Sequence, residues 1–258
     1  MIRALRFLGS VTVLTCWHGA RILIHALRRV RYRPGGIYDR INRAWASGMM
    51  RWNRVQATVE GLDRLAADQP YVYVANHVSF IDIWVLLERL PGSVRFVYKK
   101  ELGGIPVFGP AMRASGHIAI DRTNRASAFA AYDVAARDVR GGTSAMIFAE
   151  GTRSRDGRLL PFKKGPFVLA IAAQAPVVPI AILGAFESLP KGRIAPRDVP
   201  VTVRIGVPMP TAGMDYGDRD ALAAECRRVM VEMGAGERQE VRGEMRRQTG
   251  VPSRGQAR

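Results

Sequence analysis

Short apolar runs alternate with amphipathic stretches over most of this chain. Runs rich in Val, Ile, Tyr and Phe are typical of buried strands, whereas apolar residues at intervals of three and four indicate helices. The predicted strands are 71–75, 94–98, 117–120, 145–148, 177–182 and 201–206, and the predicted helices are roughly 80–90, 125–140, 165–173 and 218–233. This alternation predicts an α/β fold with a mixed, largely parallel sheet flanked by helices, and with its functional loops at one edge of the sheet.

The N-terminal region has a different pattern. Residues 7–27 carry Arg21 as their only charge, and they are barely long enough to cross a hydrocarbon core of ~30 Å. Arg3, Arg6, Arg21 and Arg28 fall on one side of a helix, which favours a helix lying in the membrane interface over one that spans the bilayer. A spanning helix and an apolar helix packed on the rest of the protein remain the alternatives.

A second helical stretch follows the break at Pro34-Gly35-Gly36. Its apolar residues, repeated at three and four positions, are Ile41, Trp45, Gly48, Met49, Trp52 and Val55. We therefore predict a two-helix membrane-binding unit at residues 1–58, a folded domain at 59–234 and a basic, disordered tail at 235–258. A helix that merely covers the sheet is the alternative for the second helix.

The charge distribution supports a membrane partner. The chain has a net charge of +17, and residues 1–58 hold eleven arginines, no lysine and one acid, Asp39. Tryptophans at 17, 45 and 52 interleave with these arginines, a combination that suits the headgroup layer of an anionic membrane. Nucleic acid is the competing partner of so basic a chain, but the region is strongly apolar and carries no nucleic-acid-binding motif.

Cysteine usage excludes two kinds of site. Cys16 and Cys226 are too few for a disulfide framework and show no metal-ligand spacing. We therefore expect a reducing compartment and no metal site.

The segment Asn76–Asp82 is the strongest candidate for chemistry. It places His77 and Asp82 five positions apart, directly after the predicted strand 71–75. Histidine exchanges a proton near neutral pH, and an aspartate within reach fixes its tautomer. No Ser or Cys stands in a nucleophile motif, so the attacking hydroxyl would belong to a substrate, as in acyl transfer to an alcohol. Alternatively, Ser79 and Asp82 form a capping box that begins the next helix, and the two roles are compatible.

Three other segments also stand at strand ends. These are Gly116–Arg122, Phe148–Ser154 and Val178–Ile180. Together with the H-x4-D segment they resemble the four blocks of the glycerolipid acyltransferases, in particular the bacterial 1-acyl-glycerol-3-phosphate acyltransferases. The resemblance runs from about Tyr71 to Gly206 and includes the intervening segments Lys99–Leu102, Ile105–Gly109 and Phe162–Gly165.

The resemblance implies a reaction and a set of catalytic residues. Residues 59–234 would be the catalytic domain of an enzyme that moves a fatty acyl chain from acyl-CoA or acyl carrier protein to the 2-hydroxyl of 1-acyl-glycerol 3-phosphate. His77 would be the general base, oriented by Asp82. Lys99 and the backbone N–H of Gly151 would stabilise the oxyanion. The product would be phosphatidic acid, and no cofactor beyond the acyl donor is implied.

It also implies how the acceptor is bound. Arg122 and Arg153 would hold its phosphate, because a guanidinium engages two oxygens at once. Glu150 and Thr152 would complete the wall, Glu150 by bonding an acceptor hydroxyl or by holding Arg153. The alternative for Arg122 is a surface ion pair with Asp121.

Two positions depart from the family pattern. Ala149 replaces a proline in the third block, which makes that loop less rigid and could alter the acceptor preference. His117 stands in the second block where bulkier apolar residues are common, and we expect a partly exposed strand residue rather than a second base.

Two alternative functions stay open. One is acylation of another lysolipid, such as lyso-ornithine lipid. The other is a non-catalytic membrane-binding relative, which would be expected to lack His77 or Asp82. The expected location is the cytoplasmic face of the inner membrane.

Overall fold

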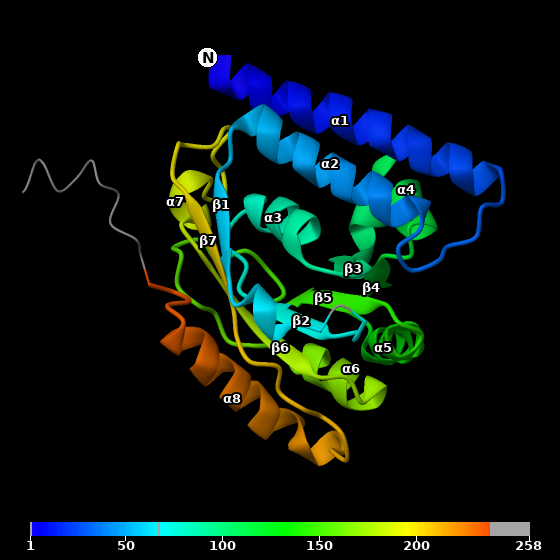
Figure 1. The fold of residues 1–258 in the computed structure, drawn as a ribbon, viewed down its shortest axis with the longest axis vertical. Coiled ribbons are helices and arrows are strands. Elements are labelled where there is room, and N and C mark those ends of the chain that lie inside the picture. The colour runs from blue at the N-terminus through cyan, green and yellow to red at the C-terminus, as the bar shows by residue number, and fades with distance from the viewer. Residues whose placement is uncertain (1, 67, 238–258) are drawn as a thin grey trace, which may run out of the picture.

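A seven-stranded sheet forms the centre of the computed structural model, which describes residues 2–66 and 68–237 (Figure 1). The strands are β1 (Ala57–Glu60), β2 (Val72–Ala75), β3 (Val94–Lys99), β4 (Ile118–Ile120), β5 (Ser144–Phe148), β6 (Val177–Leu183) and β7 (Val201–Ile205). Their order is β1-β7-β6-β2-β5-β3-β4. β6 and β7 are antiparallel, and the other described pairs are parallel, so the predicted mixed, largely parallel sheet is confirmed.

Helices cover both faces of this sheet. They are α1 (Ile2–Leu27), α2 (Ile37–Asn53), α3 (Ile81–Arg89), α4 (Phe108–Ala114), α5 (Arg125–Arg140), α6 (Gly165–Ala173), α7 (Ala185–Ser188) and α8 (Arg219–Glu232). α3 covers one face, with α2 and α1 stacked above it, and α5, α6 and α8 cover the other (Figure 1).

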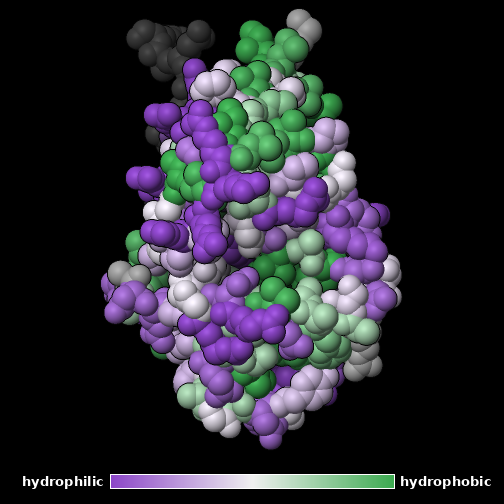
Figure 2. Space-filling model, turned by 90° about the vertical axis from the view of Figure 1, so that its right-hand side faces the viewer, coloured by the Kyte–Doolittle hydropathy of each residue, from purple (hydrophilic) through white to green (hydrophobic). Residues whose placement is uncertain are grey.

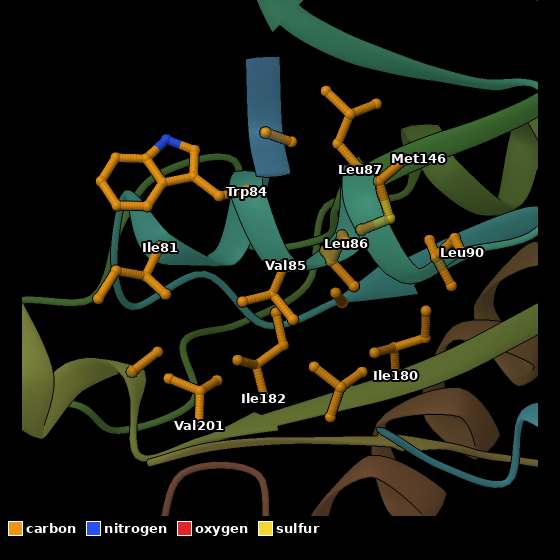
Figure 3. Packing of buried hydrophobic residues seen from close by; sticks show 14 of the residues in the cluster. Ile81, Trp84, Val85, Leu86, Leu87, Leu90, Met146, Ile180, Ile182 and Val201 are labelled. Carbon is orange, nitrogen blue, oxygen red and sulfur yellow. The ribbon is translucent and has the colours of Figure 1, made fainter. Parts of the chain in front are cut away.

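The alternation of side chains along the strands produces these two layers. On β2, Tyr73 faces the α3 side, whereas Val72 and Val74 face the α5–α6 side. On the first side, Val85 and Leu86 of α3 face Met146 of β5 and Ile182 of β6, whereas Trp84 points away from the sheet, towards Phe7 of α1 (Figure 3). The strand that precedes the His77 segment is thus buried on both faces and held rigidly.

The elements predicted from residue 71 onward are found to within one residue at each end. The sequence missed β1, α4 and the four-residue helix α7. β1 has only four residues with alternating partial burial. α4 contains Gly109 and Pro110, two residues that disfavour helices. Of the predicted tail, 235–258, all but residues 235–237 lie outside the described part of the chain.

α1 has two unlike sides. One side packs on α2 and α4, with Phe7 against Trp84 and Gly19 so close to Val107 that a Cβ there would lie 2.6 Å from its Cγ1. The other side exposes large apolar residues, namely Ile2, Leu5, Leu8, Val13, Trp17, Ile24 and Leu27. In the part of the chain that the structure describes, α1 is the one helix long and apolar enough to cross a membrane.

The apolar stripe of α2 faces the protein. Ile41 and Met49 are fully buried between α1 and the domain, while Trp52 is half exposed. Arg43 donates hydrogen bonds to the carbonyls of Glu88, Leu90 and Gly92, which satisfies the carbonyl end of α3. α2 therefore covers the domain, which is the alternative that the sequence left open for this helix.

His117 also ties α2 to the sheet, and its expected partial exposure is wrong. The residue is buried beneath α2; its Nδ1 accepts the Phe96 N–H at 3.0 Å and its Nε2 lies 3.3 Å from the amide of Asn42. Burial, with Arg95 nearby, lowers the pKa of His117 to about 3. The imidazole is therefore neutral, and it serves as a packing and hydrogen-bonding residue.

Candidate active site

The parallel strands bring the predicted site residues to one edge of the sheet. β2 lies between β5 and β6, and both neighbours run parallel to it. His77 follows the end of β2 and Glu150 follows the end of β5, so they become neighbours although 73 residues separate them. β3 ends at Lys99 and β4 ends shortly before Arg122, on the far side of β5. Such an edge, beyond the carboxyl ends of the strands, is where α/β proteins bind ligands.

Asn76 fixes the exit of the chain from β2. Its side-chain amide donates to the carbonyl of Ile182 at 3.0 Å and accepts from the Ile182 N–H at 2.7 Å. The side chain thereby pairs with the backbone of β6 as a further strand residue would. It places His77 at a fixed distance from the sheet.

His77 and Asp82 form a buried, hydrogen-bonded pair. His77 Nδ1 lies 2.8 Å from Asp82 Oδ2, and the same oxygen accepts the N–H groups of Val78 and Ser79, each at 2.8 Å. The Asp82 side chain is fully buried, whereas 14% of the His77 side chain is exposed. Asp82 fixes the tautomer with the proton on Nδ1, which leaves Nε2 free to accept another.

The capping interpretation of this segment is correct in part. α3 begins at Ile81, with Phe80 rather than Ser79 at the N-cap position and no side-chain cap. Ser79 Oγ instead accepts the Ile81 N–H at 3.2 Å and donates to the carbonyl of Leu189 at 2.8 Å. Asp82 satisfies the backbone just before the helix while it orients His77, so one carboxylate has both roles.

Two residues of the third block support His77 from the opposite side. The ring of Phe148 stacks on the imidazole, with centroids 3.8 Å apart and planes 10° apart. Glu150 is buried and accepts the N–H groups of His77 at 2.7 Å and Leu160 at 2.8 Å. Burial raises the pKa of Glu150 to about 7, against the opposing effect of these two hydrogen bonds. The expected contact between Glu150 and Arg153 is not formed, because both carboxylate oxygens are used by the backbone.

The loop of residues 149–163 is closed on itself and on the His77 segment. Ser154 N–H donates to the His77 carbonyl and Lys163 N–H donates to the Ala149 carbonyl, both at 2.8 Å. Gly151 has a φ of +71°, a conformation that favours glycine. Its N–H donates to the Phe148 carbonyl at 3.0 Å and closes a turn. This N–H, which was expected to be free to bind the oxyanion, therefore already has a partner in this geometry.

The two predicted phosphate ligands lie at the rim of this loop. Arg122 donates to the carbonyl of Gly151. The guanidinium of Arg153 lies over the ring of Phe80, 3.9 Å from its centroid, and burial lowers its pKa while Asp82 opposes that change. Thr152 is exposed at the tip of the loop between them.

The two lysines at the end of β3 form ion pairs with two different acids. Lys99 is half exposed and lies 3.6 Å from Glu101. Lys100 pairs at 2.5 Å with Asp121, which raises the lysine pKa and lowers that of the aspartate. Asp121 is thus committed to Lys100, and the alternative surface pair with Arg122 is not formed.

The structure thus brings His77, Asp82, Glu150 and Gly151 together, with the two arginines and Thr152 at the rim. It leaves Lys99 beside Glu101. Sequence reasoning assigned no role to Asn76, Phe148 or Ser154, although all three stand inside the quoted blocks. Their contacts depend on which strands are neighbours, which the sequence does not specify.

Comparisons with known proteins identify the family of this chain. Residues 56–183 match a family model described as "Acyltransferase". The 1-acyl-sn-glycerol-3-phosphate acyltransferase of Cocos nucifera is 31% identical over 209 residues, which are 80% of this chain and 65% of the coconut protein. The protein of the same name from Limnanthes douglasii is 34% identical over 197 residues, with 76% and 68% covered.

A solved structure extends the match to most of the chain. It is the crystal structure of the 1-acyl-sn-glycerophosphate (LPA) acyltransferase, PlsC, from Thermotoga maritima, with a TM-score of 0.71 and 25% identity. The match covers 93% of this chain and 97% of the Thermotoga chain.

Fold and site together define a protein of the acyltransferase class. The chain belongs to the family of the 1-acyl-sn-glycerol-3-phosphate acyltransferases, so the resemblance seen in its four blocks is confirmed. It spans slightly less than two thirds of the coconut relative's length.

Proposed function

We propose that this protein transfers a fatty acyl chain from a thioester donor to the 2-hydroxyl of 1-acyl-glycerol 3-phosphate, giving phosphatidic acid. The observation that carries the proposal is the 2.8 Å pair of His77 and Asp82 at the strand edge. Arginines suited to a phosphate lie at the same edge, and relatives with this reaction in their names support the choice of acceptor. The donor is acyl-CoA or acyl carrier protein, since both present the same kind of thioester.

In this mechanism His77 acts as the general base. Its Nε2 takes the proton of the 2-hydroxyl while the oxygen attacks the thioester carbonyl, and Asp82 stabilises the imidazolium that results. Collapse of the tetrahedral intermediate forms the ester and breaks the carbon–sulfur bond, and the departing thiolate takes the proton from His77. Placed general-base catalysis of this kind contributes roughly 10²–10⁴ in rate.

The oxyanion of the intermediate needs donors that meet it as charge develops. Lys99 is held only by an exposed ion pair with Glu101 at 3.6 Å, an interaction that contributes little stability. It is therefore free to turn towards the oxyanion when substrate binds. The Gly151 N–H can serve there only if it is released from Phe148.

The acceptor phosphate is assigned to the rim of the 149–163 loop. Arg122 and Arg153 present guanidinium groups there, and Thr152 adds an exposed hydroxyl between them. Arginine suits this task because its planar fork binds two phosphate oxygens at once.

We further propose that the protein docks on an anionic membrane through α1. Its outer side presents uncharged apolar residues from Ile2 to Leu27, and apolar residues gather next to a strongly hydrophilic band at that end of the molecule (Figure 2). Buried apolar area and attraction of arginines to anionic lipids both favour an interfacial helix. The cytoplasmic face of the inner membrane suits a chain without a disulfide framework and a cytoplasmic thioester donor.

The deciding experiment supplies purified protein with labelled acyl-CoA or acyl carrier protein and a panel of lysolipids in anionic micelles. We expect transfer to lysophosphatidic acid that is lost in His77→Ala and retained in the control Arg228→Ala, whose arginine forms exposed ion pairs within α8. Transfer only to a lysolipid without a phosphomonoester, such as lyso-ornithine lipid, would overturn the acceptor. No transfer with either donor would overturn the enzymatic function.

A further inference from the structure

The side chain of Lys163 lies against the same backbone turn as Arg122. A Cβ built on Gly151 would lie 3.5 Å from Lys163 Cγ, 4.0 Å from Lys163 Cε and 3.9 Å from Arg122 Nη1. Both cationic side chains therefore flank one point of the loop, and Lys163 Cε and Arg122 Nη1 lie at most about 8 Å apart. A phosphate that accepts hydrogen bonds of about 2.8 Å on two of its oxygens fits a gap of this size.

The backbone that carries Lys163 is held on both sides. Its N–H donates to the Ala149 carbonyl at 2.8 Å. Three residues earlier, Leu160 N–H donates to the buried Glu150. From α8, Arg227 donates to the Leu160 carbonyl at 2.9 Å and lies over the ring of Phe162, 5.4 Å from its centroid. The stem of Lys163 is thus anchored to the loop beside His77.

Neither cation has an acidic partner within residues 2–66 and 68–237. Among the described residues, no acid forms an ion pair with Lys163 or Arg122, and Asp121 is committed to Lys100. Two positive charges this close repel each other unless an anion lies between them. The neighbouring Lys164 shows the contrast, because it forms an ion pair with Asp220 of α8 at 3.0 Å.

We propose that Lys163 binds a phosphate group of the substrate together with Arg122, Arg122 with its planar fork and Lys163 as a point charge. The inference rests on the proposed function and adds a substrate-binding residue to its site. The phosphate is either the phosphomonoester of the lysolipid acceptor or a phosphate of the coenzyme A donor. Both have the same chemistry, and the kinetics distinguish them.

The test compares Lys163→Gln with Lys164→Gln, two adjacent substitutions that remove the same charge. KM and kcat are measured for lysophosphatidic acid at saturating acyl-CoA, and for acyl-CoA at saturating lysophosphatidic acid. We expect Lys163→Gln to raise one KM about tenfold, the effect of losing one charge-assisted hydrogen bond, with kcat within about twofold. Lys164→Gln should leave both KM values unchanged, and Lys163→Arg should restore most of the affinity.

Each outcome has one meaning. A rise confined to lysophosphatidic acid assigns Lys163 to the acceptor phosphate, and a rise confined to acyl-CoA assigns it to the donor. Unchanged KM values, a rise in both or a lowered Tm overturn the inference, since the last two indicate general damage to the loop. Absence of transfer by the wild type and by Lys164→Gln would instead overturn the proposed function.

Discussion

Two loops meet at the catalytic edge of the sheet, and they differ in how their polar side chains are satisfied. In residues 76–82, Asn76, His77 and Asp82 are bonded to protein groups and largely buried. In residues 149–163, the inner Glu150 is bonded in the same way, but Arg153 and Lys163 have no acidic partner among the described residues. The histidine–aspartate pair assigned to proton transfer is therefore prepositioned by the protein, whereas the cations assigned to the substrate have unmet charge.

The strongest test of this difference removes the charge of Asp82 from the first loop. Asp82→Asn keeps an oxygen for the N–H groups of Val78 and Ser79 but loses the carboxylate that stabilises the His77 imidazolium. We expect kcat to fall by roughly 10²–10⁴ with KM changed by less than about twofold, as for other histidine–aspartate pairs. Steady-state kinetics beside Asp220→Asn as the control would check it, and a fall in kcat below about tenfold would contradict the assigned role.

Glu150 lies in the second loop, but protein groups satisfy its side chain as they satisfy the polar side chains of the first loop. Its pKa is raised from the ordinary 4.5 to about 7, so the folded protein binds this proton more tightly than the unfolded chain does. The corresponding stability is present in full below pH 4.5 and is lost as the pH rises through about 7. We expect wild type to lose up to about 3 kcal/mol of unfolding free energy relative to Glu150→Gln across this window.

Denaturant unfolding at pH 4.5, 6 and 8 would measure this difference. Parallel curves for wild type and Glu150→Gln would show that folding does not raise the pKa of Glu150. Glu150→Ala should lose a further few kcal/mol at every pH, because the N–H groups of His77 and Leu160 are then left unsatisfied.

Arg153 is a side chain of the other kind. It is a cation that has no acidic partner among the described residues and is assigned to the substrate. Arg153→Gln should raise the KM for lysophosphatidic acid about tenfold with little change in Tm, since no protein carboxylate loses a partner. Arg153→Lys should recover only part of the affinity, because an ammonium lacks the fork and the flat stacking surface over Phe80. A fall in kcat at unchanged KM would instead place Arg153 in the chemical step.

The same division explains what could be predicted from the sequence. The His77–Asp82 pair spans five positions of one loop, so local spacing was enough to find it. α5 and α6 carry their own apolar signals, and their predicted bounds are confirmed. The short edge strand β1 and the Gly- and Pro-containing α4 have weak local signals and depend on tertiary packing.

Contacts that the sequence pattern does not reveal account for the errors. Glu150 bonds to His77 because β2 and β5 are neighbours, a fact that no local pattern contains. His117 is buried because α2 lies over it, which the polarity of histidine alone argues against. The Gly151 N–H is occupied by a turn within its own block, and family resemblance gives no information about that hydrogen bond.

The smallest expected effect concerns a contact between the end of β5 and the first loop, the stack of Phe148 on His77. The rings lie 3.8 Å apart and nearly parallel, so Phe148 restricts the imidazole on its flat side while Asp82 fixes it in its plane. Phe148→Leu keeps an apolar side chain but removes the stack, and we expect kcat to fall two- to tenfold, equivalent to about 0.5–1.5 kcal/mol. Phe162→Leu, which removes a ring stacked on Phe167 instead, is the matched control and should leave kcat unchanged. Equal kcat values for the two variants would mean that Asp82 and the backbone hydrogen bonds position His77 without help from the Phe148 ring.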